Sequence, residues 1–289
     1  MARISYVNGR YIDHQRAVVH IEDRGYQFAD GVYEYIAFYS HMPLDMEPHI
    51  NRLMRSLDEL EIAMPVAKEA LPVIIGELIS RNRRDDGGIY IQITRGVARR
   101  DHAFPSVNVR PSLVITICGA KTPKPQDFTN GVEVITHNDN RWGRCDIKSV
   151  SLLANVLAKQ EAVSNKVKEV ILVDKNGFVT EGAASNVFIV TKSGDIVTHQ
   201  ADESILSGIT RGVVVDIANS MGITVLERSF SIKELVEASE VFITSTSINV
   251  LPVVKIGDKV IGNGKVGELT NKLQMLYNSH IYEQTGKKF

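Results

Sequence analysis

Cysteine clusters and long apolar runs are nearly absent from this chain of 289 residues. Its two cysteines, Cys118 and Cys145, lack CxxC spacing, so neither a disulfide framework nor a metal site such as zinc is indicated, and a reducing compartment is favoured. No apolar run reaches the 18 or so residues that span a bilayer, and the first residues, MARISYVNG, lack the apolar core of a signal peptide. We therefore expect a cytoplasmic protein with no membrane partner.

Net charge is also nearly absent, because 33 basic residues are offset by 34 acidic ones to leave -1. Such a chain has no overall field to attract nucleic acid or an anionic membrane. Apolar residues make up 44% and charged residues 23%, as in ordinary globular proteins, and no biased tract suggests disorder. This composition favours a folded protein that acts on small molecules.

The chain is about twice as long as a typical domain, which predicts two domains. The stretch KTPKPQD over 121–127 carries two prolines and few apolar groups, so we expect an extended, exposed linker there. The sequence then predicts a small α/β domain over 1–120 and a larger, strand-rich mixed α/β domain over 128–289.

Local patterns predict the main elements of both domains. Asn8-Gly9 is typical of a tight turn in a hairpin over 4–13. Apolar residues recur at helical spacing after Pro48 and over 68–82. Further predictions are strands over 88–96 and 112–120, a helix over 151–163 that Ser149 or Ser151 caps, a helix in TRGVVVDIANSMG, and strands in GVEVITH, EVILVD, FVTEG, NVFIVTK, DIVTH, TVLERSF and EVFITS.

Lys148 lies in CDIKS between a strand-rich stretch and the helix predicted after it. A lysine becomes a nucleophile when burial or a neighbouring cation lowers its pKa, and Arg141, Arg144 and the apolar flanks offer both conditions. A solvated surface lysine is the alternative. Position alone does not decide between them.

Glu181 lies in FVTEGAASNVF, where the small residues after it leave space for a flat ring. A carboxylate beside a pyridine nitrogen keeps that nitrogen protonated, so the ring can accept electrons released from a substrate carbon. The alternative is a solvated glutamate at the end of a strand.

The segment LSGIT over 206–210 combines a glycine, which permits close backbone approach, with the start of a predicted helix. Unpaired N–H groups at a helix N-terminus bind phosphate well. The hydroxyl of Thr210, the Ser-Thr-Ser run around Thr246 and the cation of Arg52 are candidates to complete a phosphate site. The alternative is an ordinary helix-entry turn and a solvated arginine.

The stretches RGYQFADGVYE, HINRL, IQITRG, CDIKS, VTEGAASNVF, LSGITR and FITSTS together resemble the fold-type IV pyridoxal-phosphate enzymes over nearly the whole chain. That group contains D-amino acid aminotransferases, branched-chain aminotransferases and aminodeoxychorismate lyases. The resemblance implies a two-domain α/β (α+β) fold with a C-terminal pseudo-barrel. It also implies the following roles: Lys148 as the Schiff-base lysine, Glu181 as the partner of the pyridine nitrogen, and Arg52, Ile209, Thr210 and Thr246 as phosphate contacts.

Tyr33 in DGVYE and the run TRGVARRDHAF look like the D-amino acid aminotransferase subgroup. The resemblance implies that Tyr33, Arg100 and His102 hold the substrate α-carboxylate, each as a hydrogen-bond donor. It also implies a homodimer with shared sites, in which the arginine and histidine come from the neighbouring subunit. Ala183 and Ala184 depart from the serines that relatives often carry, which puts cofactor affinity in doubt.

We therefore expect a reversible transfer of an amino group from a D-amino acid, such as D-alanine, to a 2-oxo acid, such as 2-oxoglutarate. Lys148 acts in both halves as the base that moves the proton of the substrate Cα. A branched-chain L-amino acid aminotransferase and an aminodeoxychorismate lyase are the alternatives on the same scaffold, and the pair Arg100 and His102 argues against both. A non-enzymatic metabolite-binding protein is the alternative from a different class.

Overall fold

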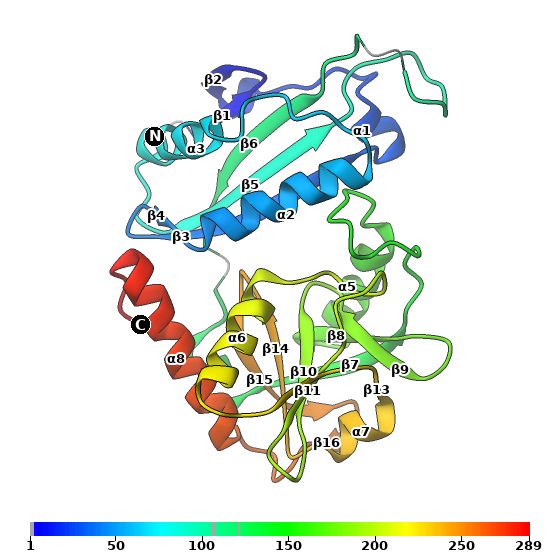
Figure 1. Ribbon diagram of the computed structural model, residues 1–289, viewed down its shortest axis with the longest axis vertical. Coiled ribbons are helices and arrows are strands. Elements are labelled where there is room, and N and C mark those ends of the chain that lie inside the picture. Colours follow the sequence, from blue (N-terminus) through cyan, green and yellow to red (C-terminus); the bar gives the residue numbers. More distant parts are fainter. Residues whose placement is uncertain (1–2, 106–107, 121) are drawn as a thin grey trace. The chain divides into compact units, whose positions relative to one another are not determined.

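The computed structural model describes residues 3–105, 108–120 and 122–289, which separate into two compact units (Figure 1). The N-terminal unit comprises the chain up to residue 121 together with the segments Ile147–Ser151 and Tyr282–Lys288. The C-terminal unit comprises Thr122–Asp146, Leu152–Ile281 and Phe289. The five residues around Lys148 thus belong to the N-terminal unit, although the chain on both sides of them belongs to the other unit.

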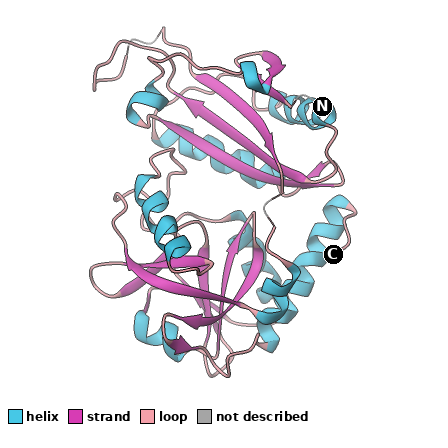
Figure 2. Ribbon diagram, turned by 180° about the vertical axis from the view of Figure 1, so that it is seen from behind, coloured by secondary structure: helices cyan, strands magenta, loops and turns pink. Residues whose placement is uncertain are grey.

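The N-terminal unit is built on a six-stranded antiparallel sheet in the order β2-β1-β6-β5-β3-β4. Its strands are β1 (Ile4–Val7), β2 (Arg10–Asp13), β3 (Gly31–Tyr39), β4 (Met42–Pro43), β5 (Gly87–Thr94) and β6 (Ser112–Cys118). Its helices are the short η1 (His14–Arg16), α1 (Arg24–Phe28), α2 (Met46–Glu59) and α3 (Ala70–Asn82). Figure 2 shows these helices beside the strands.

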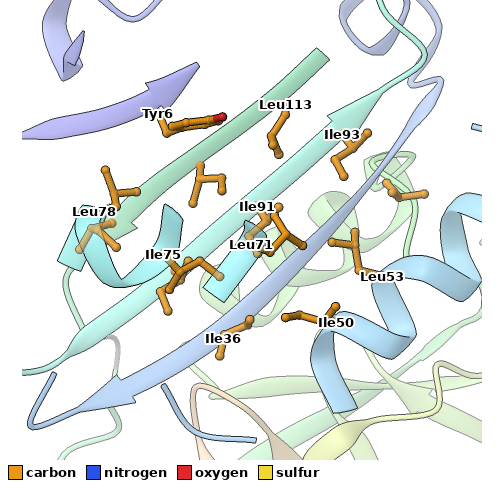
Figure 3. Close-up of a cluster of buried hydrophobic side chains, with 14 of the residues drawn as sticks. Tyr6, Ile36, Ile50, Leu53, Leu71, Ile75, Leu78, Ile91, Ile93 and Leu113 are labelled. Atoms are coloured by element: carbon orange, nitrogen blue, oxygen red, sulfur yellow. The ribbon is translucent and has the colours of Figure 1, made fainter. Parts of the chain in front are cut away.

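One apolar cluster joins the sheet of the N-terminal unit to α2 and α3 (Figure 3). Every second residue of β5, such as Ile91 and Ile93, is fully buried there, as expected for the inner face of a pleated strand. The helices contribute residues three or four positions apart, including Leu53 on α2 and Leu71 and Ile75 on α3. This packing fixes β3 and α2, and both carry residues predicted for the site.

The C-terminal unit contains a ten-stranded mixed sheet in the order β12-β11-β10-β14-β15-β7-β8-β9-β13, with β16 paired to β15. Its strands are β7 (Val132–Asn138), β8 (Glu169–Val173), β9 (Phe178–Gly182), β10 (Asn186–Val190), β11 (Ile196–Thr198), β12 (Val225–Glu227), β13 (Phe230–Ser231), β14 (Glu240–Ser245), β15 (Asn249–Ile256) and β16 (Lys259–Val260). Its helices are α4 (Pro125–Asn130), α5 (Leu153–Ser164), α6 (Ile209–Ser220), α7 (Ile232–Glu237) and most of α8 (Glu268–Thr285).

A single apolar cluster is built from strands across this sheet, from Val197 on β11 through Ile243 and Leu251 to Val179 on β9. Strands that far apart in the sheet order share one core only if the sheet curls around it. Among the described residues there is no helix that combines the length and the apolar character needed to cross a membrane.

Most of the predicted elements are present. Asn8 and Gly9 have φ values of 46° and 92°, which confirms the predicted tight turn between β1 and β2. The helix predicted over 68–82 begins two residues later, at Ala70. The run TVLERSF forms two short strands, β12 and β13, rather than one.

The prediction of an extended stretch over 121–127 was wrong in its second half, and residue 121 lies outside the described residues. Helix α4 begins at Pro125, where the fixed φ of proline suits a first helical position. The backbone N–H of Lys124 donates to Asp127 Oδ2 at 3.1 Å, which completes a capping box. Proline therefore starts a helix here instead of keeping the chain extended.

The prediction that Ser149 or Ser151 caps the following helix was also wrong. Helix α5 has Leu152 at its N-cap and no side-chain cap. Ser149 lies instead in an extended segment that pairs with the start of β3, as shown by the bridge between Val32 and Ser149. A long-range strand contact therefore replaced the local capping interaction.

Candidate active site

Lys148 is fixed through its backbone and its side chain within the N-terminal unit. The N–H of Tyr33 donates to the Lys148 carbonyl at 2.9 Å, and the Lys148 N–H donates to Ser56 Oγ at 3.2 Å. Its amine, Nζ, donates to the Tyr33 hydroxyl at 3.3 Å and lies 4.3 Å from the centre of that ring. The side chain is half-buried, so the alternative of a solvated surface lysine was wrong.

Tyr33 is held in turn by its neighbour across the sheet. Its ring stacks on that of Tyr90 of β5 with centroids 5.7 Å apart, and the Tyr90 hydroxyl donates to Gln92 at 2.7 Å. Burial, followed by the proximity of Tyr33, raises the pKa of Tyr90 to about 12, so this phenol stays protonated at neutral pH. The stacked pair gives the Tyr33 hydroxyl a fixed position beside the lysine amine.

Arg52 belongs to a buried charged group on the same unit. It binds the Glu34 carboxylate through Nη2 at 2.6 Å and Nε at 3.0 Å, and His49 Nδ1 lies 3.0 Å from the same carboxylate. Burial alone raises the pKa of Glu34, but Arg52 and then His49 hold it well below its ordinary value. The arginine side chain is only 9% exposed, so the alternative of a solvated arginine was wrong.

The sequence reasoning missed Glu34 and His49. A signal for Glu34 was present, because a charged residue interrupts the apolar strand GVYEYIAFY and a buried carboxylate needs a cation. His49 precedes Arg52 by three positions on α2, which places both side chains on one face of the helix.

Glu181 lies on β9 in the C-terminal unit and is 6% exposed. Its carboxylate forms an ion pair with Arg141 and accepts hydrogen bonds from Asn186 Nδ2 at 3.0 Å and from the Leu206 N–H at 3.2 Å. A buried carboxylate with these donors is held as an anion. The alternative of a solvated glutamate was therefore wrong, and Asn186 is a site residue that the sequence reasoning missed.

Arg141 is shared between two carboxylates. Its Nη2 lies 2.7 Å from Asp139 Oδ2, and the Thr180 hydroxyl donates to the same oxygen at 2.7 Å. Burial alone raises the pKa of Asp139, but these hydrogen bonds keep it below its ordinary value. Asp139, Arg141 and Glu181 together carry one net negative charge, which a protonated ring nitrogen would neutralise.

Arg141 and Arg144 were both proposed as cations that lower the pKa of Lys148. Both guanidinium groups have carboxylate partners in the C-terminal unit: Arg141 as described above, and Arg144 with Asp146 at 3.0 Å. Their charge is balanced locally, so Arg141 serves the carboxylate of Glu181 instead.

Helix α6 begins at Ile209, and its first intrahelical hydrogen bond runs from the Gly212 N–H to the Gly208 carbonyl at 3.0 Å. The preceding N–H groups, including that of Thr210, have no acceptor within the helix. A Cβ on Gly208 would lie 2.0 Å from Asn186 Oδ1, so only glycine fits there. Asn186 also donates to the Leu206 carbonyl at 2.9 Å and so links the carboxylate of Glu181 to the approach of α6.

The remaining predicted phosphate contact, Thr246, directly follows β14, the strand against which α6 packs. It is half-buried, and its neighbours Ser245 and Ser247 lie within hydrogen-bonding distance of each other at 3.3 Å. Ile209, Thr210 and Thr246 thus belong to the same unit and to contacting elements.

Arg100 and His102 lie in the loop after β5, and both side chains are exposed. The Arg100 guanidinium carbon is 4.6 Å from the centre of the Phe28 ring, and the His102 ring centre is 5.4 Å from it. The structure therefore brings this predicted pair together on one aromatic ring of α1.

These groups fit pyridoxal phosphate. The half-buried amine of Lys148 suits its aldehyde, the anionic carboxylate of Glu181 suits its pyridine nitrogen, and the glycine-flanked start of α6 suits its phosphate. Ala183 and Ala184 next to Glu181 leave room for a ring. The site thereby defines the class of the protein as a pyridoxal-phosphate enzyme.

Solved structures support this class. A branched-chain aminotransferase from the organism abbreviated T.th., with pyridoxamine 5'-phosphate, superposes with a TM-score of 0.89 at 26% identity over 100% of this chain and 96% of its own. The Escherichia coli branched-chain aminotransferase gives the same TM-score at 23% identity, over 100% and 97%, and therefore shows the fold alone. The predicted two-domain α/β fold-type IV class is confirmed.

Residues 31–256 match the family of amino-transferase class IV, and the chain belongs to that family. It is 43% identical over 276 residues to a D-alanine aminotransferase of Staphylococcus haemolyticus, which covers 96% of this chain and 97% of that protein. A D-alanine aminotransferase of Bacillus licheniformis is 41% identical, over 97% and 98%. The predictions of an aminotransferase and of pyridoxal phosphate as its cofactor are thereby confirmed.

Proposed function

We propose that the protein transfers the amino group of a D-amino acid, such as D-alanine, to a 2-oxo acid, such as 2-oxoglutarate. Identity supports this choice, since the D-alanine aminotransferases are 40–43% identical to the chain and the branched-chain enzymes of the same fold 23–26%. The observation that carries it is the pairing of Arg100 with His102 on the Phe28 ring. A guanidinium and an imidazole side by side offer several donors to one carboxylate.

The shared fold does not decide between the two substrates. A TM-score of 0.89 describes the path of the backbone, whereas substrate choice depends on a few side chains. The Arg100–His102 pair supports the D-amino acid, and the branched-chain L-amino acid remains the alternative that the experiment below tests.

We assign cofactor binding to residues of both units. Lys148 binds the aldehyde carbon through Nζ, Glu181 binds the pyridine nitrogen, and the phosphate is held by Arg52, Ile209, Thr210 and Thr246. When bound, pyridoxal phosphate accepts the electrons released at the substrate Cα. The side chain of Tyr33 supports this assignment through its 3.3 Å hydrogen bond with the lysine amine.

The proton of the substrate Cα is moved by Lys148 Nζ. A primary amine held at one end of a fixed side chain is suited to take that proton and to return it to a different carbon. The Tyr33 hydroxyl keeps the amine oriented when it is not covalently engaged, and Ser56 fixes the lysine backbone below it. In the other half of the site, Arg141, Asn186 and the Leu206 N–H keep the Glu181 carboxylate anionic.

We further propose a homodimer in the cytoplasm, in which Arg100 and His102 complete the site of the neighbouring subunit. Both side chains are exposed in the single chain, as groups that serve another subunit must be. Helix α5 exposes Leu153, Val156 and Leu157 by 59–73%, and apolar patches of this kind typically mark protein interfaces. The free state of Cys118 and Cys145 is compatible with a reducing compartment.

A panel of D- and L-amino acids with 2-oxoglutarate tests the substrate, with the chirality of the glutamate formed as the readout. We expect D-alanine to be converted with formation of D-glutamate. Turnover of L-leucine or L-valine without turnover of D-alanine would establish the branched-chain alternative. A protein that has no cofactor reducible by borohydride and converts none of these would be a metabolite-binding protein.

A further inference from the structure

We propose that helix α1 positions the Arg100–His102 pair through Phe28 and Arg24, and thereby sets the affinity of the enzyme for the substrate carboxylate. This inference rests on the proposed function, because it assumes that Arg100 and His102 bind that carboxylate. Helix α1 lies beside the loop after β5 (Figure 1).

Arg24 attaches the backbone of this loop to α1. Its side chain is 4% exposed and binds Asp30 through Nε at 2.7 Å. Its Nη1 donates to the Asp101 carbonyl at 2.6 Å, and its Nη2 to the His102 carbonyl at 3.5 Å. The planar guanidinium therefore fixes two consecutive residues of the loop, and Arg100 directly precedes them.

Phe28 holds the two side chains that the loop presents. The guanidinium carbons of Arg24 and Arg100 lie 4.8 and 4.6 Å from its ring centre, and the His102 ring lies 5.4 Å from it. No described residue accepts a hydrogen bond from the side chain of Arg100 or His102. A guanidinium that lies with its face on a ring keeps its edge of N–H donors free for a planar carboxylate.

The charges around this platform leave Arg100 unneutralised. Asp30 is already shared by Arg24 and by Arg95, whose Nε lies 2.8 Å from the same oxygen. Arg95 is further fixed by the carbonyl groups of Leu60 and Glu61. Because the nearby carboxylate is engaged twice, the positive charge of Arg100 remains available to an incoming substrate anion.

Phe28 is suited to this task because it contributes little to the fold. It is half-buried and is not among the described side chains of the apolar cluster of the N-terminal unit. Without its ring, Arg100 can leave the oriented arrangement, and the apparent affinity falls in proportion to the population that remains competent. Stacking of a cation on an aromatic ring corresponds to about a 2- to 30-fold change in such a population.

The experiment compares Phe28→Leu with Phe28→Tyr in the holoenzyme. Leucine removes the ring, and tyrosine keeps it. Tyr26→Leu is the matched control, because Tyr26 is on the same helix and 77% exposed. The readouts are KM and kcat for D-alanine, and the inhibition constant of propionate, a simple carboxylate that is not turned over.

We expect Phe28→Leu to raise the KM for D-alanine and the inhibition constant of propionate by the same factor, about 2- to 30-fold, with kcat nearly unchanged. Phe28→Tyr should restore both values, and Tyr26→Leu should change neither. In the double variant Phe28→Leu, Arg100→Ala, the first substitution should add nothing to the second, because Phe28 acts through Arg100.

Arg100→Ala separates the two proposals. If Arg100→Ala raises KM and Phe28→Leu does not, the positioning role is wrong and the proposed function stands. If Arg100→Ala leaves KM unchanged, the proposed carboxylate contact fails and the inference fails with it. A lower kcat together with an earlier thermal transition in Phe28→Leu, or full additivity in the double variant, would show a general structural role and overturn the inference.

Discussion

At the scale of single residues, the carboxylate of Glu181 depends on donors from three parts of the C-terminal unit, Arg141, Asn186 and Leu206. Glu181→Gln should lower kcat by orders of magnitude, because an amide does not keep a ring nitrogen protonated. It also turns an N–H group towards other donors, which should cost about 1–3 kcal/mol of unfolding free energy. Steady-state kinetics and urea unfolding measure the two effects. Near-normal turnover with cofactor bound would mean that the ring nitrogen has another partner.

Lys148 offers the second test at this scale. Lys148→Ala should abolish turnover and covalent cofactor binding, because it removes the amine that reacts with the aldehyde. Mass spectrometry of the borohydride-reduced wild-type protein should find the phosphopyridoxyl group on Lys148. Lys175→Ala, in an exposed turn between β8 and β9, is the control and should behave as wild type. A modified lysine elsewhere in the wild-type protein would contradict the assignment of the site.

At the scale of elements, α2 presents Arg52 to the buried carboxylate of Glu34 on β3. The lowered pKa of Glu34 means that its ion pair stabilises the fold above the ordinary value of 4.5 and loses that contribution as pH falls through the folded-state pKa. Arg52→Met should cost about 3–5 kcal/mol of unfolding free energy at neutral pH, since it leaves a buried charge without its main partner.

The pH dependence of Arg52→Met gives a second readout. The pKa of Glu34 should rise in this variant, because burial is then opposed by His49 alone. Part of the lost stability should return as pH is lowered and Glu34 takes up a proton. The control is Arg55→Met on the same helix, whose partly exposed pair with Glu59 at 3.6 Å should contribute less than about 1 kcal/mol. Equal losses in both variants would show that the Glu34 pair is not special.

Sequence periodicity predicted the elements whose pattern is local. The turn at Asn8 and Gly9 and the apolar face of α2 follow from the conformational preferences and spacing of neighbouring residues. Ser149 shows where this fails, since its local preference for a cap is overridden by pairing with β3, more than 100 positions earlier in the chain.

The same distinction holds for the candidate site. Lys148 and Glu181 could be recognised because each lies in a motif of consecutive residues. Glu34, as the partner of Arg52, is missed by motifs, because the ion pair joins a strand to a helix 18 positions later. Asn186 is missed for a related reason: its role depends on the turn that brings Leu206 and Gly208 to it. Such partners follow from tertiary packing and not from local sequence.

At the scale of the whole molecule, the proposed dimer makes the site a property of two chains. Arg100→Ala alone should lower kcat/KM for D-alanine about 30- to 1,000-fold, as expected for about 2–4 kcal/mol of transition-state binding from a bidentate ionic contact. His102→Ala should be milder, because one neutral donor contributes less than a guanidinium. Amines that lack a carboxylate should be nearly indifferent to both substitutions, which separates lost recognition from damage to the loop.

Subunit exchange tests the shared site directly. Arg100→Ala protein and Lys148→Ala protein, each nearly inactive alone, should regain activity when mixed, because a heterodimer combines an intact lysine from one chain with an intact arginine from the other. Exchange itself is followed by mass spectrometry of differently tagged chains, and Arg99→Ala mixed with Lys148→Ala controls for the loss of a neighbouring exposed cation. If shared sites exist, the recovered activity should approach one working site per heterodimer. Demonstrated exchange without recovery would place Arg100 in the site of its own subunit or outside both sites, and the D-amino acid assignment would then rest on sequence identity alone.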